Sequence, residues 1–358
     1  MRPETGFGVI GVGTWGGLHA RVYASTPGAH LAAICDANGE RARQVGEACG
    51  AARIYTDYRQ LLDDPNVQAV SIALPDFLHR EATVAAAQAG KHILVEKPLA
   101  TTEADCLAML EAAQAAGVLL FVDFHNRWSP LFHALKQALE AGELGNPQLI
   151  TYRLSDTLYV PTQMLSWARH SSVAWFLASH CLDTLLWLMN ARAYARGEAG
   201  DTIERLSCLT RSRLLGPEYG VDTPDFYLTT LEWKSGLVAH VENSWILPES
   251  GPSVVDMKCQ FLGSRGAFYL DGARHGAIQK HTDRASYPDA FVTPTLYGRP
   301  MGFGAESIRH FAQCVMTGQR PLVDGADGLA VTRLILKMEE SAQKRQPVEV
   351  GPLFDPES

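Results

Sequence analysis

An apolar segment that runs straight into a glycine loop dominates the start of the chain. Residues 7–10 are followed by Gly11-Val12-Gly13-Thr14-Trp15-Gly16, which has the spacing Gly-x-Gly-x-x-Gly. A second apolar segment, residues 30–35, ends at Asp36, 20 residues after the last glycine. A strand, a glycine loop, a helix and an acidic residue in this order are typical of a dinucleotide-binding βαβ unit. An ordinary glycine turn is the alternative, because glycine clusters form turns in many folds.

Each part of this pattern has a physical reason. Gly11 permits the tight turn, Gly13 lets the backbone approach a pyrophosphate, and Gly16 lets the helix pack close to the sheet. The pyrophosphate then rests on the N–H groups at the positive end of that helix. Asp36 is placed to accept hydrogen bonds from the adenosine ribose, and its carboxylate favours NAD over NADP. Two arginines downstream leave NADP open: Arg41 and Arg43.

Residues 1–124 alternate strands and helices. The predicted strands cover residues 8–12, 30–35, 69–73, 92–95 and 119–123. The predicted helices cover residues 15–25, 39–49, 58–62, 78–89 and 103–116. This alternation predicts an α/β fold, a doubly wound parallel sheet of the Rossmann type with right-handed crossovers.

The pattern changes after residue 124, and 358 residues favour two domains. Predicted strands cover residues 148–154, 203–211, 226–233, 236–244, 254–262 and 267–270. Predicted helices cover residues 130–141, 175–189, 306–316 and 325–344. We expect a Rossmann domain over 1–124 and an α+β domain with a mainly antiparallel open sheet over 125–358. The Gly/Pro-rich residues 287–304 are predicted to form a long functional loop.

Composition excludes several classes of protein. The formal net charge is −8 and no block of lysine or arginine is present, which argues against nucleic acid or an anionic membrane as partner. No apolar run approaches the roughly 20 residues of a membrane span, and the first strand leaves no room for a signal peptide. The seven cysteines are scattered without Cys-x-x-Cys. They indicate free thiols in a reducing cytoplasm rather than disulfides or a zinc site.

Polar residues that could take part in catalysis follow the predicted parallel strands. Ligands of a doubly wound sheet bind at the carboxyl ends of its strands, which selects Leu74-Pro75, Glu96-Lys97-Pro98 and residues 123–127. Lys97 is the only lysine among them. Beside a nicotinamide ring it could exchange a proton with a substrate hydroxyl. A solvated lysine paired with Glu96 is the alternative.

A histidine in an apolar helical stretch is the second candidate for acid/base chemistry. His180 and Asp183 stand three residues apart, so their side chains share one helix face and the carboxylate could orient the imidazole. A core histidine bonded to backbone is the alternative. No His-x-x-x-His or Cys-rich pattern of metal ligands accompanies His180, and no metal is expected. The preceding polar residues could line a polyol pocket or lie at the surface: Trp167, Arg169 and His170.

Several motifs occur together in one order along nearly the whole chain. They are Gly11 to Gly16, Leu74-Pro75 with His79, residues 89–98 ending in Glu96-Lys97-Pro98, Asn126-Arg127-Trp128 with Pro130, His180 with Asp183, residues 263–266 and residues 306–311. With these motifs the chain resembles the glucose–fructose oxidoreductase/inositol dehydrogenase (Gfo/Idh/MocA) family. Glu-Lys-Pro is the most specific of them.

The resemblance implies hydride transfer between NAD(P) and a secondary alcohol of a sugar, an inositol or a related compound. It also implies an open C-terminal sheet that builds a homodimer or homotetramer. The equivalent of Lys97 positions the reacting oxygen and takes part in proton transfer, and that of His180 is the acid/base. The equivalent of Pro98 follows a cis peptide bond. Two alternatives stay open: an NAD-retaining enzyme that cleaves or eliminates glycosides, and a non-catalytic dinucleotide-binding regulator.

The motifs and the resemblance together define the expected site. The catalytic residues are Lys97, His180 and Asp183. The cofactor-binding residues are Gly11, Gly13, Thr14, Trp15, Gly16, Asp36, Leu74, Pro75, His79, Glu96, Lys97 and Pro98. The substrate-binding residues are Lys97, Asn126, Arg127, Trp167, Phe176, His180 and Asp183.

The chain departs from the family at Phe176, where many members carry an aspartate. A phenylalanine neither relays a proton nor orients an imidazole. Three consequences stay open: Asp183 or a water orients His180, Lys97 is the main acid/base, or catalysis is reduced. The ring could also narrow the pocket or stack on an apolar sugar face.

Overall fold

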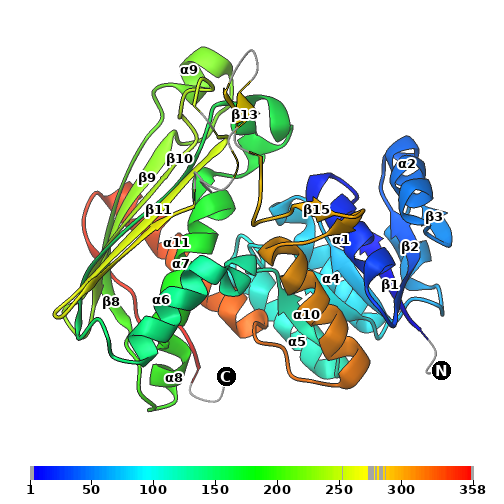
Figure 1. The fold of residues 1–358 in the computed structure, drawn as a ribbon, viewed down its shortest axis with the longest axis horizontal. Coiled ribbons are helices and arrows are strands. Elements are labelled where there is room, and N and C mark those ends of the chain that lie inside the picture. The colour runs from blue at the N-terminus through cyan, green and yellow to red at the C-terminus, as the bar shows by residue number, and fades with distance from the viewer. Residues whose placement is uncertain are drawn as a thin grey trace. The chain divides into compact units, whose positions relative to one another are not determined.

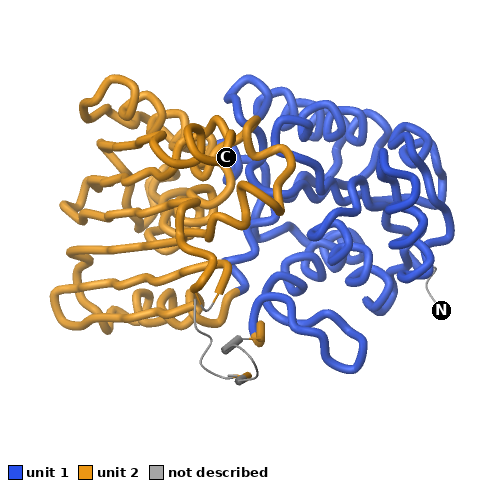
Figure 2. The backbone as a smooth tube through the Cα atoms, turned by 90° about the horizontal axis from the view of Figure 1, so that it is seen from above, with its two compact units in different colours: residues 1–128, 291–329 blue, residues 129–290, 330–358 orange. Residues whose placement is uncertain are grey.

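A computed structural model describes residues 4–251, 253–272, 278, 280–281, 285–286 and 288–355. The chain forms two compact units (Figure 2): unit 1 contains Met1–Trp128 and Phe291–Leu329, and unit 2 contains Ser129–Ala290 and Ala330–Ser358. The sequence pattern predicts one boundary after residue 124, with the rest of the chain in the second domain. The structure instead groups residues 291–329 with unit 1. One reason is that Phe311 packs against Phe7 and Phe121 in the core of that unit.

Unit 1 contains a six-stranded parallel sheet in the order β3-β2-β1-β4-β5-β6. Its strands are β1 (Thr5–Ile10), β2 (Ala29–Cys35), β3 (Arg53–Tyr55), β4 (Ala69–Ile72), β5 (His92–Val95) and β6 (Leu120–Val122). The predicted doubly wound sheet is confirmed. The three-residue β3 was not predicted, because it is short and mostly exposed. The strand order reverses between β1 and β4, where ligands of such sheets bind.

The predicted helices of unit 1 are also confirmed (Figure 1). They are α1 (Thr14–Ser25), α2 (Gly39–Cys49), α3 (Tyr58–Leu62), α4 (His79–Gln88), α5 (Glu103–Ala116) and α10 (Phe303–Thr317), with short turns η1 (Asp76–Leu78) and η2 (His125–Trp128). Capping residues at both ends of α5 explain why its predicted bounds, residues 103–116, agree with the structure. The Thr102 hydroxyl accepts a hydrogen bond from Asp105 N, and Gly117 ends the helix in the left-handed conformation.

The predicted loop over residues 287–304 is only partly described, since residue 287 lies outside the described residues. Within it, β15 (Thr295–Leu296) and β16 (Arg299–Pro300) form a small antiparallel hairpin. The sequence analysis did not predict this hairpin, because two-residue strands leave no periodicity to detect.

Unit 2 contains a seven-stranded sheet in the order β12-β11-β7-β10-β9-β8-β17. Its strands are β7 (Pro147–Asp156), β8 (Ile203–Arg211), β9 (Phe226–Trp233), β10 (Val238–Ser244), β11 (Val255–Gly263), β12 (Ala267–Asp271) and β17 (Val348–Glu349). The pair β7/β10 is parallel and the other neighbouring pairs are antiparallel. The prediction of a mainly antiparallel sheet is therefore confirmed. A separate short pair consists of β13 (Lys280–His281) and β14 (Ala285–Ser286).

Helices cover one face of this sheet (Figure 1). Along this face lie α6 (Pro130–Glu140), α7 (Ser179–Leu188) and the larger part of α11 (Gly325–Lys344). Unit 2 also contains α8 (Ala191–Ala195) and α9 (Leu215–Tyr219), with turns η3 (Val160–Met164), η4 (Ala168–His170) and η5 (Ala174–Ala178). Beneath α7 and α11, Asn243 Nδ2 contacts Cys181 Sγ and the Ser341 hydroxyl accepts from Cys208 N. The predicted helix over residues 175–189 differs in its first turn, because η5 is a π-helical turn and α7 starts at Ser179.

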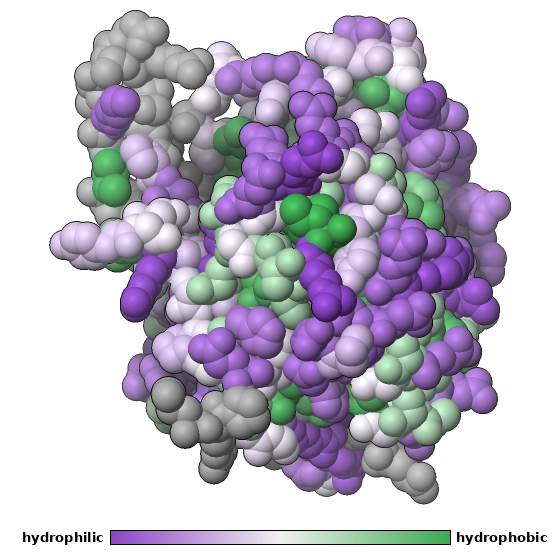
Figure 3. All heavy atoms as spheres, turned by 90° about the vertical axis from the view of Figure 1, so that its right-hand side faces the viewer, coloured by the Kyte–Doolittle hydropathy of each residue, from purple (hydrophilic) through white to green (hydrophobic). Residues whose placement is uncertain are grey.

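The described surface agrees with the composition. On the side of α2 and β3, hydrophobic residues form small separate patches among hydrophilic ones (Figure 3). None of the helices in the described part of the chain has the length and hydropathy needed to cross a membrane. All seven cysteines are free thiols.

Candidate functional site

The three motif glycines occupy different environments after β1. Gly11 has a φ of +84°, a conformation that favours glycine. A Cβ at Gly16 would collide with the carbonyl oxygen of Gly11. A Cβ at Gly13 would meet nothing within 4 Å among the described residues. Gly11 and Gly16 are thus required by the fold of the loop, whereas Gly13 borders open space that a ligand can enter.

This open space lies beside the N-terminus of α1. Gly13 is the N-cap, and no described side chain caps the helix. The first-turn N–H groups therefore stay available for an anion, with the positive end of the helix dipole behind them. Thr14 and Trp15 open the helix, and the Trp15 ring stacks on His125 with 5.0 Å between ring centroids. An open backbone cradle at an uncapped helix end fits the pyrophosphate of NAD.

Asp36 follows β2 and is oriented toward the glycine loop. Its Oδ2 accepts a hydrogen bond of 2.9 Å from Val12 N, and its Oδ1 accepts one of 2.9 Å from Asn38 N. Each carboxylate oxygen has a second lone pair for a ribose hydroxyl. Arg41 Nη1 lies 3.8 Å from Asp36 Oδ2, and its side chain is half-exposed. The carboxylate is therefore fixed beside the cradle, with one flexible arginine close to it.

His79 joins two segments at the carboxyl edge of the sheet. Its ring is 1% exposed. Nε2 lies 2.9 Å from the carbonyl oxygen of Leu74 and Nδ1 lies 2.8 Å from that of Pro98. The peptide bond Lys97–Pro98 is cis, which confirms the expectation from the family resemblance. The buried His79 ring thus links the segments around Pro75 and Pro98 through hydrogen bonds to both.

Lys97 follows β5 and is next in the chain to Glu96, which belongs to a group of buried polar side chains. We call His19, Tyr23, Ser71, Glu96 and Asp123 the buried cluster; all are buried. His19 Nε2 lies 3.1 Å from Glu96 Oε1 and 3.7 Å from Asp123 Oδ2. His19 Nδ1 lies 2.8 Å from Ser71 Oγ, which lies 2.6 Å from the Tyr23 hydroxyl.

Charges in and near this cluster are strongly perturbed. Burial acts to raise the pKa of Glu96, but the hydrogen bond and charge of His19, with the charge of Lys97, outweigh it and hold that pKa below its ordinary value. Burial and the negative charge of Glu96 raise the pKa of Asp123 to about 7. Burial lowers the pKa of His125 to about 4. At neutral pH, Glu96 is ionised and His125 is a neutral imidazole.

The sequence analysis named Asp123 as part of the strand edge but missed His19 as its partner. The position of Asp123 directly after β6 was the available signal. His19 carries no local signal, because its contact with Glu96 joins residues 77 positions apart.

Arg127 has partners inside unit 1. Its Nη2 lies 3.0 Å from Asp327 Oδ1 in a largely buried ion pair, and its Nη1 donates to the carbonyl oxygen of Leu322. These contacts tie η2 to the start of α11. The neighbouring Asn126 is 9% exposed. Arg127 was predicted to bind substrate, and these contacts hold its guanidinium within unit 1.

His180 and Asp183 lie in α7, directly after the π-helical turn η5. They are 8% and 1% exposed, and their spacing places them on one face of the helix. The Ser179 hydroxyl donates to Trp175 O and the Thr184 hydroxyl donates to His180 O. Single π-helical turns of this kind are frequent at functional sites.

Phe176 lies within η5, between two tryptophan rings. Its ring centroid is 6.3 Å from that of Trp167, in an edge-on arrangement, and 5.7 Å from that of the fully buried Trp245. The position that holds an aspartate in many relatives is therefore part of an aromatic group, one turn before His180. Arg169 and His170, also considered for the pocket, are exposed in η4.

The predicted site residues fall into two groups by unit. The glycine loop, Asp36, Lys97 and the buried cluster belong to unit 1. Trp167, Phe176, His180 and Asp183 belong to unit 2. Unit 1 therefore carries the residues suited to a dinucleotide together with Lys97, and unit 2 carries the aromatic residues and the pair His180 and Asp183.

Two family models match the chain, one for each part. Residues 5–124 match the oxidoreductase family, NAD-binding Rossmann fold, and residues 136–350 match the oxidoreductase family, C-terminal alpha/beta domain. Together the two matches cover nearly all of the sequence.

Named relatives align over the full length. The chain is 28% identical over 355 residues to the myo-inositol 2-dehydrogenase of Thermotoga maritima, covering 96% of this chain and 98% of that protein. It is 27% identical over 356 residues to the scyllo-inositol 2-dehydrogenase (NAD(+)) of Bacillus subtilis, covering 98% and 97%. A crystal structure of a probable dehydrogenase from Thermotoga maritima superposes with a TM-score of 0.81 at 27% identity, over 98% of this chain and all of that one.

Proposed function

Because the chain belongs to the Gfo/Idh/MocA oxidoreductase family, we propose that it transfers hydride between NAD and a secondary alcohol of a polyol. The observation that carries the proposal is the arrangement at one edge of the parallel sheet. The open cradle at Gly13, the fixed carboxylate of Asp36 and the buried Lys97 follow β1, β2 and β5. Cofactor and substrate meet at such strand ends in doubly wound folds.

The residues of unit 1 fit NAD. The Gly11–Gly16 loop and the N-terminus of α1 would hold the pyrophosphate, and Asp36 would bind the ribose hydroxyls. Leu74-Pro75 and the cis-linked Pro98, fixed by His79, would line the nicotinamide end. The bound cofactor supplies a ring that accepts or returns a hydride. The chain itself has to bind the alcohol and move its proton.

Lys97 and His180 are the proposed proton-transfer residues. Oxidation of an alcohol releases a hydroxyl proton together with the hydride, so a positioned base speeds the reaction. Lys97 is 8% exposed, which leaves its amine largely shielded from water. Asp183 shares the helix face of His180 and takes the orienting role that an aspartate at position 176 would have. Phe176 and Trp167 offer apolar surfaces for the C–H groups of a sugar or inositol ring.

We propose an inositol or a sugar-like polyol as substrate, following the inositols named for two of the relatives. The same relatives favour a dehydrogenase over a glycoside-cleaving enzyme or a regulator. The free thiols support a reducing, cytoplasmic location.

A screen of inositols, aldoses and sugar acids with NAD and with NADP tests the proposal. We expect at least one polyol to yield NADH in a one-to-one ratio with the oxidised product. We also expect NAD to raise the melting temperature more than NADP does. Absence of any stabilisation by either cofactor would contradict the cofactor assignment. Turnover without net consumption of NAD would instead support the glycoside-cleaving alternative.

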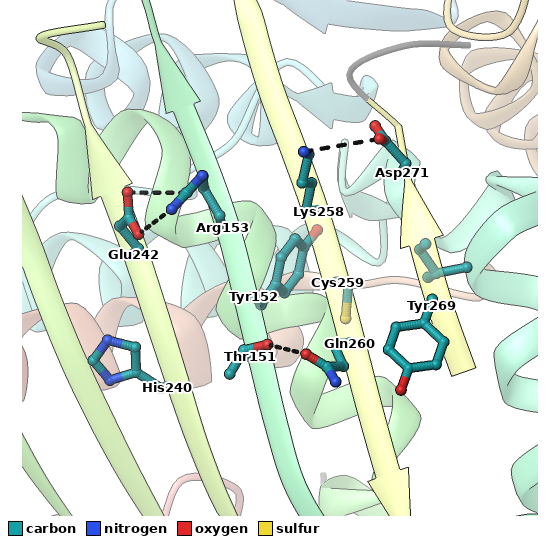
Figure 4. A pocket seen from close by; sticks show the side chains of 11 residues that line it. Thr151, Tyr152, Arg153, His240, Glu242, Lys258, Cys259, Gln260, Tyr269 and Asp271 are labelled. Carbon is teal, nitrogen blue, oxygen red and sulfur yellow. Dashed lines mark hydrogen bonds and ion pairs between the residues drawn. The ribbon is translucent and has the colours of Figure 1, made fainter. Parts of the chain in front are cut away.

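We further propose that unit 2 forms a homodimer or homotetramer through the uncovered face of its sheet. This face contains a hollow of about 530 Å³ lined by Thr151, Arg153, Glu242, Lys258 and Tyr269, among others (Figure 4). Exposed apolar side chains accompany ion pairs there: Leu149, Leu209 and Tyr269. Such a mixture of aliphatic and paired charged groups suits a protein interface.

Light scattering of the purified protein tests this assembly. We expect a mass of two or four chains for the wild type. Leu209→Glu should lower it by placing a charge on the open sheet face. Leu322→Glu, at another exposed leucine that lies in unit 1, is the matched control and should leave the mass unchanged. A monomeric wild type at micromolar concentration would contradict the proposal.

A further inference from the structure

The buried cluster contains one acid that the proposed mechanism does not use. Asp123 is fully buried directly after β6. Neither of its carboxylate oxygens accepts a hydrogen bond of ordinary geometry from a described residue. His19 Nε2 lies 3.7 Å away. The Ser307 hydroxyl of α10 donates to the carbonyl oxygen of Gly304, and its interaction with the Asp123 carboxyl only partly offsets the rise in the pKa of Asp123. A buried carboxyl group without strong donors is costly as an anion and is retained more easily as a neutral acid.

The other members of the cluster satisfy one another without Asp123. A carboxylate only accepts hydrogen bonds, so the ionised Glu96 receives the Nε2–H of His19. His19 Nδ1 and Ser71 Oγ share a hydrogen bond, and so do Ser71 Oγ and the Tyr23 hydroxyl. Burial raises the pKa of Tyr23, which keeps its hydroxyl proton in place. The charges of His19 and Lys97 both favour the Glu96 anion.

The groups around Asp123 come from five neighbouring elements. α1 contributes His19 and Tyr23, β4 contributes Ser71, the end of β5 contributes Glu96 and Lys97, η2 contributes His125, and α10 contributes Ser307. Lys97 interacts electrostatically with both carboxyl groups, Glu96 and Asp123. The interaction is reciprocal. If the positive charge of Lys97 favours the Asp123 anion, the anion favours the protonated form of Lys97 by the same free energy.

We propose that Asp123 is a positioning residue of the reaction, whose carboxyl group controls how tightly Lys97 Nζ holds its proton. With Asp123 neutral, Lys97 interacts with one negative charge fewer and gives up its proton more readily. With Asp123 ionised, a second negative charge in a water-poor site retains the Lys97 proton. No covalent bond changes in this step; a proton leaves Asp123 for solvent or returns to it. The effect on turnover rests on the proposed role of Lys97.

Competitive labelling of lysines with an amine-reactive anhydride tests the inference without requiring turnover. The extent of labelling at Lys97 is measured by mass spectrometry as a function of pH in the full chain. Asp123→Asn removes the charge and keeps the shape. We expect the Lys97 labelling curve to move to lower pH by about two units, the size of effect that a single charge produces about 6 Å away at an effective dielectric constant of about 20.

Asp64→Asn is the matched control. Asp64 is also a buried carboxylate of unit 1. Burial lowers the pKa of Lys91, and the charge of Asp64 partly offsets that lowering. Its loss should move the labelling curve of Lys91 and leave that of Lys97 unchanged. Asp123→Asn should move the labelling curve of Lys97 and leave that of Lys91 unchanged. This crossed pattern separates a local charge effect from general loosening of the unit.

The pH profile of kcat/KM supplies the functional readout. The limb that reports Lys97 should move in Asp123→Asn by the same amount as the labelling curve, with unchanged affinity for NAD. Asp123→Ser serves as a second neutral variant if Asp123→Asn does not fold. An unshifted Lys97 labelling curve in the neutral variants would overturn the inference, even in an active enzyme. A stoichiometric divalent cation on the purified protein would also overturn it. The side-chain atoms of His19, Glu96 and Asp123 lie within 4.8 Å of one another, and a cation would then replace the proton.

Discussion

At Gly13 a methyl group would enter the open space beside α1, whereas at Gly16 it would collide with the Gly11 carbonyl oxygen. The two glycines look alike in the motif, but each position requires glycine for a different reason. One is needed by the ligand and the other by the loop. This distinction gives a prediction at the scale of single residues.

Gly13→Ala should fold normally and bind NAD at least tenfold more weakly, a loss of about 1.4 kcal/mol, because the methyl group occupies the cradle. Gly17→Ala is the control, since its Cβ would only touch the far end of Arg21 at 3.5 Å. It should keep NAD affinity, and better helix propensity should add about 0.5–1 kcal/mol to the free energy of unfolding. Calorimetric titration with NAD measures the affinities. Equal affinities for both variants would contradict the cradle.

Asp123 predicts a second residue-scale effect, on stability. An aspartate in an unfolded chain has a pKa of about 3.9, whereas burial and the charge of Glu96 raise the pKa of Asp123 to about 7. Between these values the folded protein holds more protons at this site, so its free energy of unfolding falls as pH rises.

Asp123→Asn removes this loss. The melting temperature of the variant relative to wild type should therefore increase from pH ~4 to pH ~8, by several degrees. Thermal unfolding across this range measures the difference. A gap that stays constant would show that the pKa of Asp123 is not raised by folding, and a gap that grows in favour of the wild type would show that folding lowers it.

Residue chemistry was predictable where it depends on local order in the chain. Asp36 and Lys97 were found because each directly follows a strand whose end is recognisable. The pair His19/Glu96 was not found, since it is made by folding α1 against β5 and leaves no spacing in the sequence.

At the scale of elements, η2 and the start of α11 are joined by the ion pair Arg127–Asp327. Breaking a largely buried pair leaves one charge uncompensated, so Arg127→Ala should lower the free energy of unfolding by about 3–5 kcal/mol. Asp327→Asn should also destabilise the protein, since it unpairs Arg127. Denaturant unfolding measures both. If Arg127→Ala raised KM while stability stayed at the wild-type level, Arg127 would be a substrate ligand instead.

Element boundaries were predictable where caps fix them, as at Thr102 and Gly117 of α5. The π-helical turn before His180 could not be predicted from the sequence. A single wide turn hardly changes the apolar pattern of residues 175–189, so periodicity still predicts one continuous helix.

At the scale of the whole molecule, the two-domain fold followed from the change in pattern after residue 124. The sequence pattern did not predict that residues 291–329 belong to unit 1. The apolar face of α10 predicts that the helix is packed, but not that Phe311 packs against Phe7 and Phe121. Pairing of distant elements depends on the complete core, which no local window contains.

The central claim is that a chain with this NAD cradle uses Lys97 to move the proton of a polyol hydroxyl. The most direct test measures NADH formation from the best polyol by Lys97→Met, with Lys91→Met as the control lysine of the same unit. We predict that Lys97→Met lowers kcat by about 10²–10⁴-fold, the usual contribution of a positioned acid/base. It should still be stabilised by NAD, and Lys91→Met should turn over normally. A folded Lys97→Met that binds NAD and turns over within a few-fold of wild type would contradict the account.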